Sequence, residues 1–154
     1  MEIIELQQIP GIETNAKLKA KYLHFDKLLD ELRKRELPED LVMSVNHEIE
    51  ELNASRDPET DSRRMIAKKQ VTILKLLEKE LNLVPINHYR NLWLALGIAA
   101  FGIPLGVVFA ASIGNMGFMG IGLPMGIPIG IAIGSGLDKK AMEEGRQLDW
   151  DING

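Results

Sequence analysis

The side chains that could do chemistry are few and widely separated along this chain. There is no cysteine, and the three histidines are His24, His47 and His88. His47 and Glu51 are four residues apart, and so are Glu36 and Asp40, so each pair would share one helix face. Such pairs arise by chance on charged helices and do not complete a zinc or calcium site. We therefore expect no catalytic residue, no metal and no cofactor.

The glycine-rich stretches do not indicate a nucleotide site either. They lie in apolar sequence and lack the Lys-Ser/Thr pair of a phosphate-binding loop. The net charge of −4 does not favour nucleic acid as a partner. No ionisable residue lies within residues 91–137, which argues against a proton relay or a coupled transporter.

Charge is distributed very unevenly along the chain. All 18 basic and 22 acidic residues lie outside residues 91–137. A membrane span needs about 20 apolar residues, so this stretch has the length of two spans. We place them at about 92–113 and 116–137, with a break at Gly114 and Asn115. The stretch is too long for the buried helix of a typical soluble domain.

The charges that flank this stretch predict its orientation. Arg90 precedes it, and Lys139, Lys140 and Arg146 follow it, whereas the connecting turn carries no charge. The positive-inside rule then places both termini in the cytoplasm.

Small residues recur every four positions in both expected spans, and we assign them to helix packing. They are Gly102, Gly106, Ala110 and Gly114 in the first span, and Gly122, Gly126, Gly130 and Gly134 in the second. Four residues turn a helix through about 400°, so each set forms one shallow groove that admits a neighbouring backbone. A second small face of the later span, at Pro124, Pro128, Ala132 and Gly136, lies on the opposite side. One groove would face the hairpin partner, and the other a second subunit, lipid or the helical domain.

Three prolines near the middle of the spans predict helix kinks, at Pro104, Pro124 and Pro128, because each removes a backbone hydrogen bond. The alternation of small and large residues also has the period of a strand. Proline is excluded from central strands, so we favour helices.

The sequence before the uncharged stretch predicts three amphipathic helices. The first begins at Thr14 or Asn15 and ends before Pro38, the second covers about 39–54, and the third opens at Asp57-Pro58 after a loop at 53–56 and runs to about Leu83. Their apolar stripes would pack on each other or bind a partner. The basic residues of the third helix would form a solvated face or meet anionic lipid; they are Arg63, Arg64, Lys68, Lys69, Lys75 and Lys79.

The small-residue spans followed by Leu-Asp-Lys-Lys-Ala-Met-Glu-Glu-Gly-Arg-Gln-Leu resemble uncharacterised bacterial glycine-zipper membrane proteins. The resemblance covers about residues 100–148. It implies a two-span hairpin in a bacterial inner membrane and no catalytic residue.

The sequence as a whole predicts an all-α membrane protein, with a cytoplasmic helical bundle or antiparallel coiled coil and a transmembrane helical hairpin. Its expected parts are an N-terminal segment 1–13, a helical domain 14–84, a juxtamembrane linker 85–91, the hairpin 92–137 and a cytoplasmic tail 138–154. The expected function is that of a non-enzymatic integral membrane protein, which self-associates through its glycine-zipper transmembrane helices and presents a cytoplasmic helical scaffold or docking domain. Its partners would be the lipid bilayer, other copies of the chain and a cytoplasmic protein. The alternatives are a homo-oligomeric pore and a simple membrane anchor.

Overall fold

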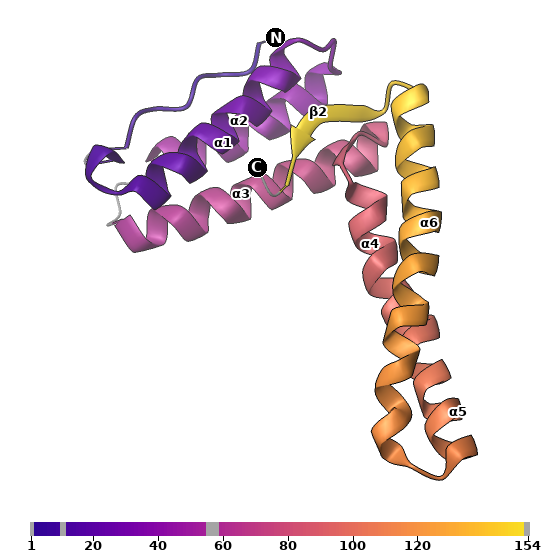
Figure 1. Cartoon of the computed structure of the whole chain (residues 1–154). Coiled ribbons are helices and arrows are strands. Elements are labelled where there is room, and N and C mark those ends of the chain that lie inside the picture. The colour runs from indigo at the N-terminus through magenta and orange to yellow at the C-terminus, as the bar shows by residue number, and fades with distance from the viewer. Residues whose placement is uncertain (1, 10–11, 55–58, 153–154) are drawn as a thin grey trace. The chain divides into compact units, whose positions relative to one another are not determined.

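The computed structural model describes residues 2–9, 12–54 and 59–152, without the side chains of residues 59–61. The chain divides into two compact units, coloured by residue number in Figure 1. Unit 1 comprises Met1–Val84 and Leu148–Gly154, and unit 2 comprises Pro85–Gln147. Most of the described chain is helical, which confirms the predicted helical class.

The first helix of unit 1 begins where the sequence predicts. A short 3-10 turn, η1 (Ile12–Thr14), precedes α1 (Ala16–Arg33). The side chain of Asn15 accepts a hydrogen bond from the backbone N–H of Leu18 at 3.1 Å, which satisfies one of the free donors at the helix start. α1 ends at Arg33, before Pro38, as predicted. Proline disfavours the helical conformation of the residue that precedes it.

The next two helices are confirmed, with small differences from the prediction around them. α2 (Glu39–Ala54) has the predicted bounds, so the predicted loop is wrong at Asn53 and Ala54, which are helical. The predicted start of the third helix at Asp57-Pro58 lies outside the described residues. α3 (Glu59–Leu81) ends two residues before Leu83, because Asn82 adopts a left-handed backbone conformation with φ 52°.

The apolar stripes of the three helices form one hydrophobic core. α3 packs against both α1 and α2. The fully buried helical side chains include Leu18, Phe25, Leu28, Leu29, Leu32, Val45, Ile49, Ile66, Ile73 and Leu77. The stripes therefore pack on each other in unit 1, and coiled-coil geometry stays a prediction.

Segments near both ends of the chain contribute to this core. The expected helical domain, residues 14–84, did not include them. Ile3 and Leu6 of the N-terminal segment are buried in the core, and so are Leu148 and Trp150 of the tail. The tail residues belong to strand β2 (Gln147–Asp151), which pairs with β1 (Val84–Ile86) in a two-stranded sheet. This sheet is not predicted from the sequence, because strands of three to five residues have too few positions for a recognisable period-two pattern.

Trp150 anchors the tail on α1. Its indole N–H donates to the backbone carbonyl of His24 at 3.0 Å, and the two rings stack with centroids 4.3 Å apart. Burial lowers the pKa of His24, and the nearby positive charges of Lys21 and Lys27 lower it further, whereas Asp151 and a backbone hydrogen bond act in the opposite direction. The neutral imidazole is therefore favoured in this stack.

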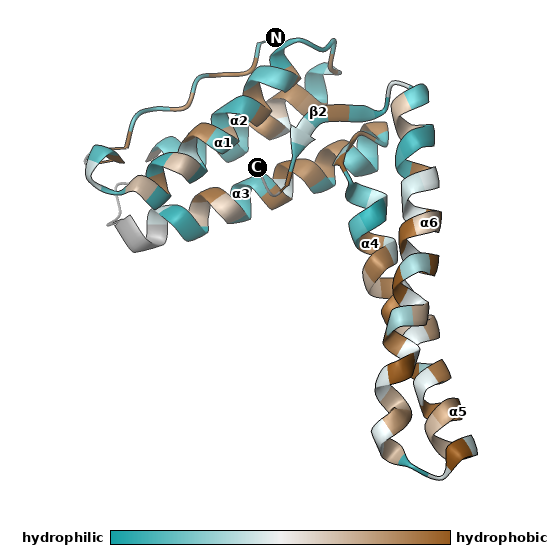
Figure 2. Cartoon of the chain, viewed as in Figure 1, coloured by the Kyte–Doolittle hydropathy of each residue, from teal (hydrophilic) through white to brown (hydrophobic). Residues whose placement is uncertain are grey.

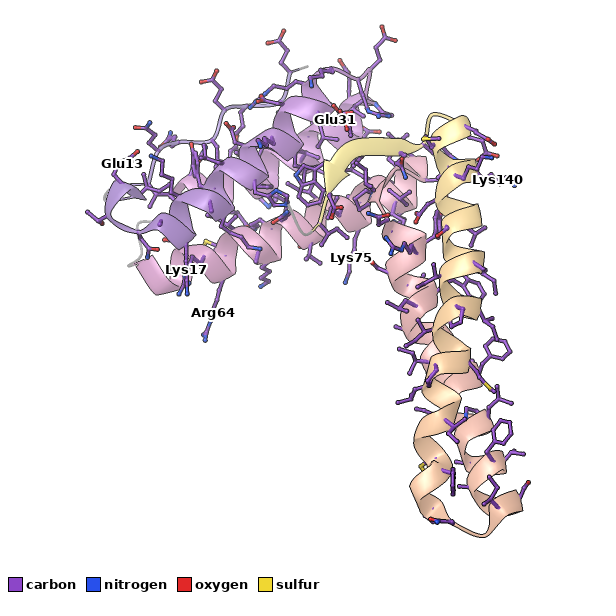
Figure 3. All side chains as sticks on the ribbon, in the orientation of Figure 1. Glu13, Lys17, Glu31, Arg64, Lys75 and Lys140 are labelled. Carbon is purple, nitrogen blue, oxygen red and sulfur yellow. The ribbon has the colours of Figure 1, made fainter. Side chains whose placement is uncertain are left out.

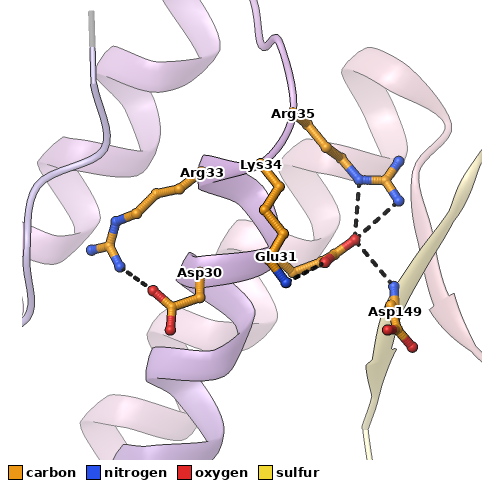
Figure 4. Close-up of polar contacts among 6 residues, drawn as sticks. All are labelled: Asp30, Glu31, Arg33, Lys34, Arg35 and Asp149. Carbon is orange, nitrogen blue, oxygen red and sulfur yellow. Dashed lines mark hydrogen bonds and ion pairs between the residues drawn. The ribbon is translucent and has the colours of Figure 1, made fainter.

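Glu31 provides a second attachment between α1 and β2 (Figure 4). Its carboxylate accepts a hydrogen bond from the backbone N–H of Asp149 at 3.4 Å and pairs with Arg35 at 3.2 Å. Burial opposes the charge of Glu31, but these hydrogen bonds outweigh it and hold the pKa of the carboxyl below its usual value. The charged form of Glu31 thus helps to hold the C-terminal strand on α1.

Lys69 occupies a different place from the solvated or lipid-facing position predicted for it. Its side chain is buried between α2 and α3, where the ammonium group pairs with Glu48 at 2.7 Å and with Glu51. Burial opposes its charge, but the two carboxylates outweigh this effect and raise the pKa of Lys69. Arg64 and Lys75 of the same helix are exposed and project away from the ribbon (Figure 3).

Candidate functional site

Unit 2 is dominated by two apolar helical arms, His88–Ile113 and Met116–Glu143, each long and apolar enough to cross a membrane. We call residues 88–143 the apolar hairpin. The first arm contains α4 (His88–Gly97), a π-helical turn η2 (Ile98–Gly102) and α5 (Ile103–Ile113). The second contains a 3-10 turn η3 (Met116–Ile121) and α6 (Gly122–Glu143).

The arms extend the predicted spans at the end away from the turn. The first begins four residues before the predicted position 92, and the second continues past 137 to Glu143. The predicted break between the arms is confirmed at Gly114, which has a left-handed backbone with φ 71°, and at Asn115, whose side chain accepts a hydrogen bond from the N–H of Gly117 at 2.9 Å. Gly114 is exposed in this turn, with open space where a Cβ atom would lie, so it takes no part in packing.

The structure brings the other predicted packing residues together inside the hairpin. Gly102, Gly106, Ala110, Gly122, Gly126, Gly130 and Gly134 are all buried. A Cβ atom added at Gly126 would lie 2.5 Å from the carbonyl oxygen of Gly97, and one at Gly134 would lie 2.5 Å from the Cα of Arg90. A Cβ atom at Gly130 would overlap the carbonyl oxygen of Trp93. The two backbones are therefore in direct contact, which only residues without a side chain permit.

Gly97 belongs to this packing face, although the four-residue pattern did not identify it. It precedes Gly102 by five positions, and the π-helical turn η2 lies between them. Within this turn the N–H of Ile103 donates to the carbonyl of Ile98, five residues earlier. The wider turn places residues five apart on the same side, so both glycines face α6.

The predicted kink prolines have different local settings. Pro104 lies in the first turn of α5, directly after η2, and Pro124 lies in the first turn of α6, directly after η3. Each arm runs through this junction as one continuous helix, so each of these prolines still removes one N–H donor, at a point where the helix type changes. Pro128 lies inside α6, where its missing N–H interrupts the ladder. The prolines thus accompany two changes of helix type and one interruption.

Large apolar side chains cover the outside of the hairpin, whose ribbon is largely in hydrophobic colours in Figure 2 and whose side chains project outward in Figure 3. The exposed ones include Leu92, Leu96, Phe101, Ile103, Val107, Val108, Ile113, Met116, Phe118, Ile121, Leu123, Met125, Ile127, Ile129 and Ile133. In water, each side chain of this size left exposed forgoes roughly 1.5–3 kcal/mol of burial. Small residues inside and large apolar residues outside are typical of helix pairs in lipid.

A buried carboxylate, that of Asp138, lies at the end of the packing face farthest from the turn at Gly114. Asp138 follows Gly134 by four residues, so it continues the register of the α6 glycines. Its two carboxylate oxygens accept hydrogen bonds from the backbone N–H groups of Tyr89 and Arg90, each at 2.9 Å. These are free donors in the first turn of α4, and Asn87 at the N-cap position makes no side-chain hydrogen bond to them.

Asp138 therefore caps a helix other than its own. An anion at a helix N-terminus is also favoured by the helix dipole. In the sequence, Asp138 is simply the first charged residue after the uncharged stretch 91–137. Its role could have been identified from the four-residue spacing of the glycines, because the next position after Gly134 in that spacing is Asp138.

The residues first considered for chemistry do not form a catalytic or metal site in the described part of the chain. His24 stacks on Trp150, His47 lies 3.3 Å from Glu51, and His88 contacts the ring edge of Tyr89. Among the described residues, no group of three or more histidine, aspartate or glutamate side chains could hold a metal ion.

Comparisons of the chain with protein-family models, with curated proteins and with solved structures found no significant match.

The hairpin packing predicts a large difference between two glycine-to-alanine changes in α6. Gly130→Ala introduces a Cβ atom against the backbone of Trp93, whereas Gly136→Ala introduces one into open space. The two variants share the same gain in helix propensity, so their difference isolates the contact. We expect Gly130→Ala to destabilise the hairpin relative to Gly136→Ala by about 1–3 kcal/mol.

The measurement is unfolding by SDS in mixed micelles, followed by the fluorescence of Trp93. A Trp150→Phe background leaves Trp93 as the single emitting tryptophan. Equal unfolding midpoints for the two variants would contradict direct backbone contact at Gly130.

The cap predicts a local effect of Asp138 on the start of α4. Asp138→Ala removes both acceptors and leaves two part-buried donors unsatisfied, at a cost of about 1 kcal/mol. We expect faster hydrogen exchange at the amides of Tyr89 and Arg90 in this variant, with little change at the amides of α5. Lys139→Ala, at an exposed neighbouring position, is the matched control. Unchanged exchange at both amides in Asp138→Ala would show that the carboxylate does not cap α4.

Proposed function

We propose that this chain is an integral membrane protein in which the apolar hairpin crosses the bilayer twice and anchors unit 1 as a non-enzymatic docking module. The observation that carries the proposal is the distribution of side chains in the hairpin. Glycine backbones occupy its interior, while branched, aromatic and methionine side chains cover its exterior. A water-soluble protein would bury these large side chains, whereas lipid solvates them.

The proposed orientation places both termini on the cytoplasmic side. The arms meet at an uncharged turn around Asn115, and their other ends carry Arg90, Lys139 and Lys140. This asymmetry supports a cytoplasmic position for the charged ends. Unit 1 contains both the first and the last described segments of the chain, so it would lie on the same side.

Thiol labelling of intact cells tests insertion and orientation together. The chain contains no cysteine, so each introduced thiol is a single site. We expect Asn115→Cys to react with an impermeant maleimide added from outside, and Ser44→Cys in α2 to react only after the membrane is permeabilised. Outside labelling of Ser44→Cys, with Asn115→Cys protected, would contradict the orientation. Recovery of the chain in the soluble fraction would contradict insertion.

We further propose that copies self-associate through the outer small face of α6, formed by Pro124, Pro128, Ala132 and Gly136. The glycines of the opposite face already contact the first arm, so they are not free for a second chain. The outer small face is exposed, and a Cβ atom at Gly136 would meet open space. Small residues at four-residue spacing let a second helix approach closely.

The pore alternative has less support from the side chains of the hairpin. The hydroxyl of Ser112 donates to the carbonyl of Val108 at 2.8 Å, and Asn115 caps η3. These groups are used within their own helices rather than arranged along a polar lining.

Bulk added to the outer small face tests self-association. Ala132→Leu/Gly136→Leu fills this face without touching the hairpin interior, and overpacking costs about 1–3 kcal/mol per site. We therefore expect the dissociation constant of the oligomer to rise at least about tenfold, at roughly 1.4 kcal/mol per decade. Energy transfer between labelled copies, diluted with lipid, measures it.

Ile127→Leu/Ile129→Leu is the matched control, because it changes exposed apolar positions at constant volume. An oligomer unaffected by Ala132→Leu/Gly136→Leu would place the interface elsewhere. A wild-type chain that is monomeric at every dilution would remove self-association and leave a simple anchor.

A further inference from the structure

The N-terminal segment of unit 1 is held in an unusual way. Residues 2–9, which we call the strap, run in extended conformation alongside α1 and α2 (Figure 1). The strap is not part of a helix or a sheet. Its main-chain groups are bound instead by side chains that project from the two helices.

Asn46 of α2 makes the first of these contacts. Its side-chain oxygen accepts a hydrogen bond from the N–H of Ile4 at 3.0 Å, and its side-chain nitrogen donates to the carbonyl of Glu2 at 2.9 Å. One amide side chain thus satisfies a donor and an acceptor two residues apart on the strap. Asn46 is itself buried.

Asn53 repeats this arrangement two helical turns further along. It accepts from the N–H of Gln7 at 2.9 Å and donates to the carbonyl of Glu5 at 3.1 Å. Seven residues advance an α-helix by about 10.5 Å, and three residues advance an extended chain by about 10 Å. The two asparagines therefore match the repeat of an extended peptide, and such a match is a property of a peptide-binding surface.

α1 binds the same strap from the other side. The hydroxyl of Tyr22 donates to the carbonyl of Leu6 at 2.9 Å, and the guanidinium of Arg33 donates to the carbonyl of Ile4 at 2.9 Å. All these bonds reach the main chain of the strap, so they do not depend on its side chains. The apolar contacts of the strap come mainly from Ile3 and Leu6, which are buried in the core three residues apart.

One flank of the strap is open. A groove of about 730 Å³ runs beside Glu2–Glu5 and is lined on its other side by Leu32, Arg35 and Val42. The strap is therefore a surface ligand of the helices rather than a segment enclosed by them.

We propose that the face of α1 and α2 that carries Tyr22, Arg33, Asn46 and Asn53 is a binding site for an extended segment, and that within an oligomer it accepts the strap of a second copy of this chain. The inference rests on the proposed function, because the hairpin confines copies to one membrane. The strap of a neighbour has the same sequence, so exchange conserves the contacts of residues 2–9 with α1 and α2.

The connection between strap and helix explains why assembly controls this exchange. The strap is followed closely by η1, whose Ile12 is itself buried in the core, and then by α1. This tether favours the strap of the same copy when copies are apart. In a self-associated pair, the neighbouring site is also at high effective concentration. Exchange then links the two copies of unit 1 reciprocally, each strap in the site of the other.

Cross-linking between singly substituted full-length chains tests the exchange. Gln7→Cys on one copy and Glu50→Cys on the other leave Tyr22, Arg33, Asn46 and Asn53 unchanged. Glu50 is exposed and lies between Asn46 and Asn53 on the same face of α2, so the two thiols come together when the strap of one copy lies on the other. Gln7→Cys with Val71→Cys, an exposed position on α3, measures random collision. We expect a short bifunctional thiol reagent in membranes to link the first pair at least about tenfold more than the control pair.

Equal yields for the two pairs would overturn strap exchange. If energy transfer between labelled copies still reports an oligomer in that case, the proposed self-association stands without the exchange. If energy transfer reports monomers, self-association itself has failed, so the two failures are distinguishable.

A labelled peptide of residues 2–9 tests the binding site on its own. Ile3→Asp/Leu6→Asp in the full-length chain removes the anchors of its own strap, and circular dichroism reports whether unit 1 stays helical. We expect saturable peptide binding to this variant, and binding at least about tenfold weaker after adding Asn46→Ala/Asn53→Ala. A folded variant that does not bind the peptide would overturn the proposed site. Should this variant unfold, Ile3→Ser/Leu6→Ser provides the same test with a milder change.

Discussion

The backbones of the two hairpin arms approach each other so closely that no side chain fits between them at Gly126, Gly130 and Gly134. The rest of unit 2 follows from this contact. Large side chains have no place inside and must cover the exterior, so the hairpin presents an apolar surface to its surroundings. The π-helical turn and the carboxylate of Asp138 keep the contact in register at two points, by bringing Gly97 onto the packing face and by fixing the start of α4.

This contact also determines what remains available to a second chain. A glycine face that is filled within the hairpin is closed to other copies, so any association between hairpins must use another surface. The outer small face of α6 has the same four-residue spacing and is exposed. A single helix can thus support one interface that defines the hairpin and one that defines an assembly, because faces offset by two residues lie on opposite sides.

Unit 1 depends on both ends of the chain in a comparable way. Three helices alone bury a modest core, and the strap and β2 add Ile3, Leu6, Leu148 and Trp150 to it. The two additions are attached differently. β2 pairs with β1 and stacks Trp150 on His24, whereas the strap is bound through side-chain amides that read only its main chain.

The sequence by itself determined the helices of unit 1, the uncharged hairpin, its break at Gly114 and the two small faces of α6, because each depends on local composition or on a period of 3.6 or four residues. Tertiary structure decided which glycine face is filled, that Gly97 belongs to it, that Asp138 caps α4, that Lys69 is buried, and that both chain ends enter the core. Most of these features bring together residues that are tens of positions apart in the sequence. The place of Gly97 depends on the π-helical turn η2, which adds one residue to a helical turn. No local period records such pairings, because they are set by which surfaces meet when the elements pack.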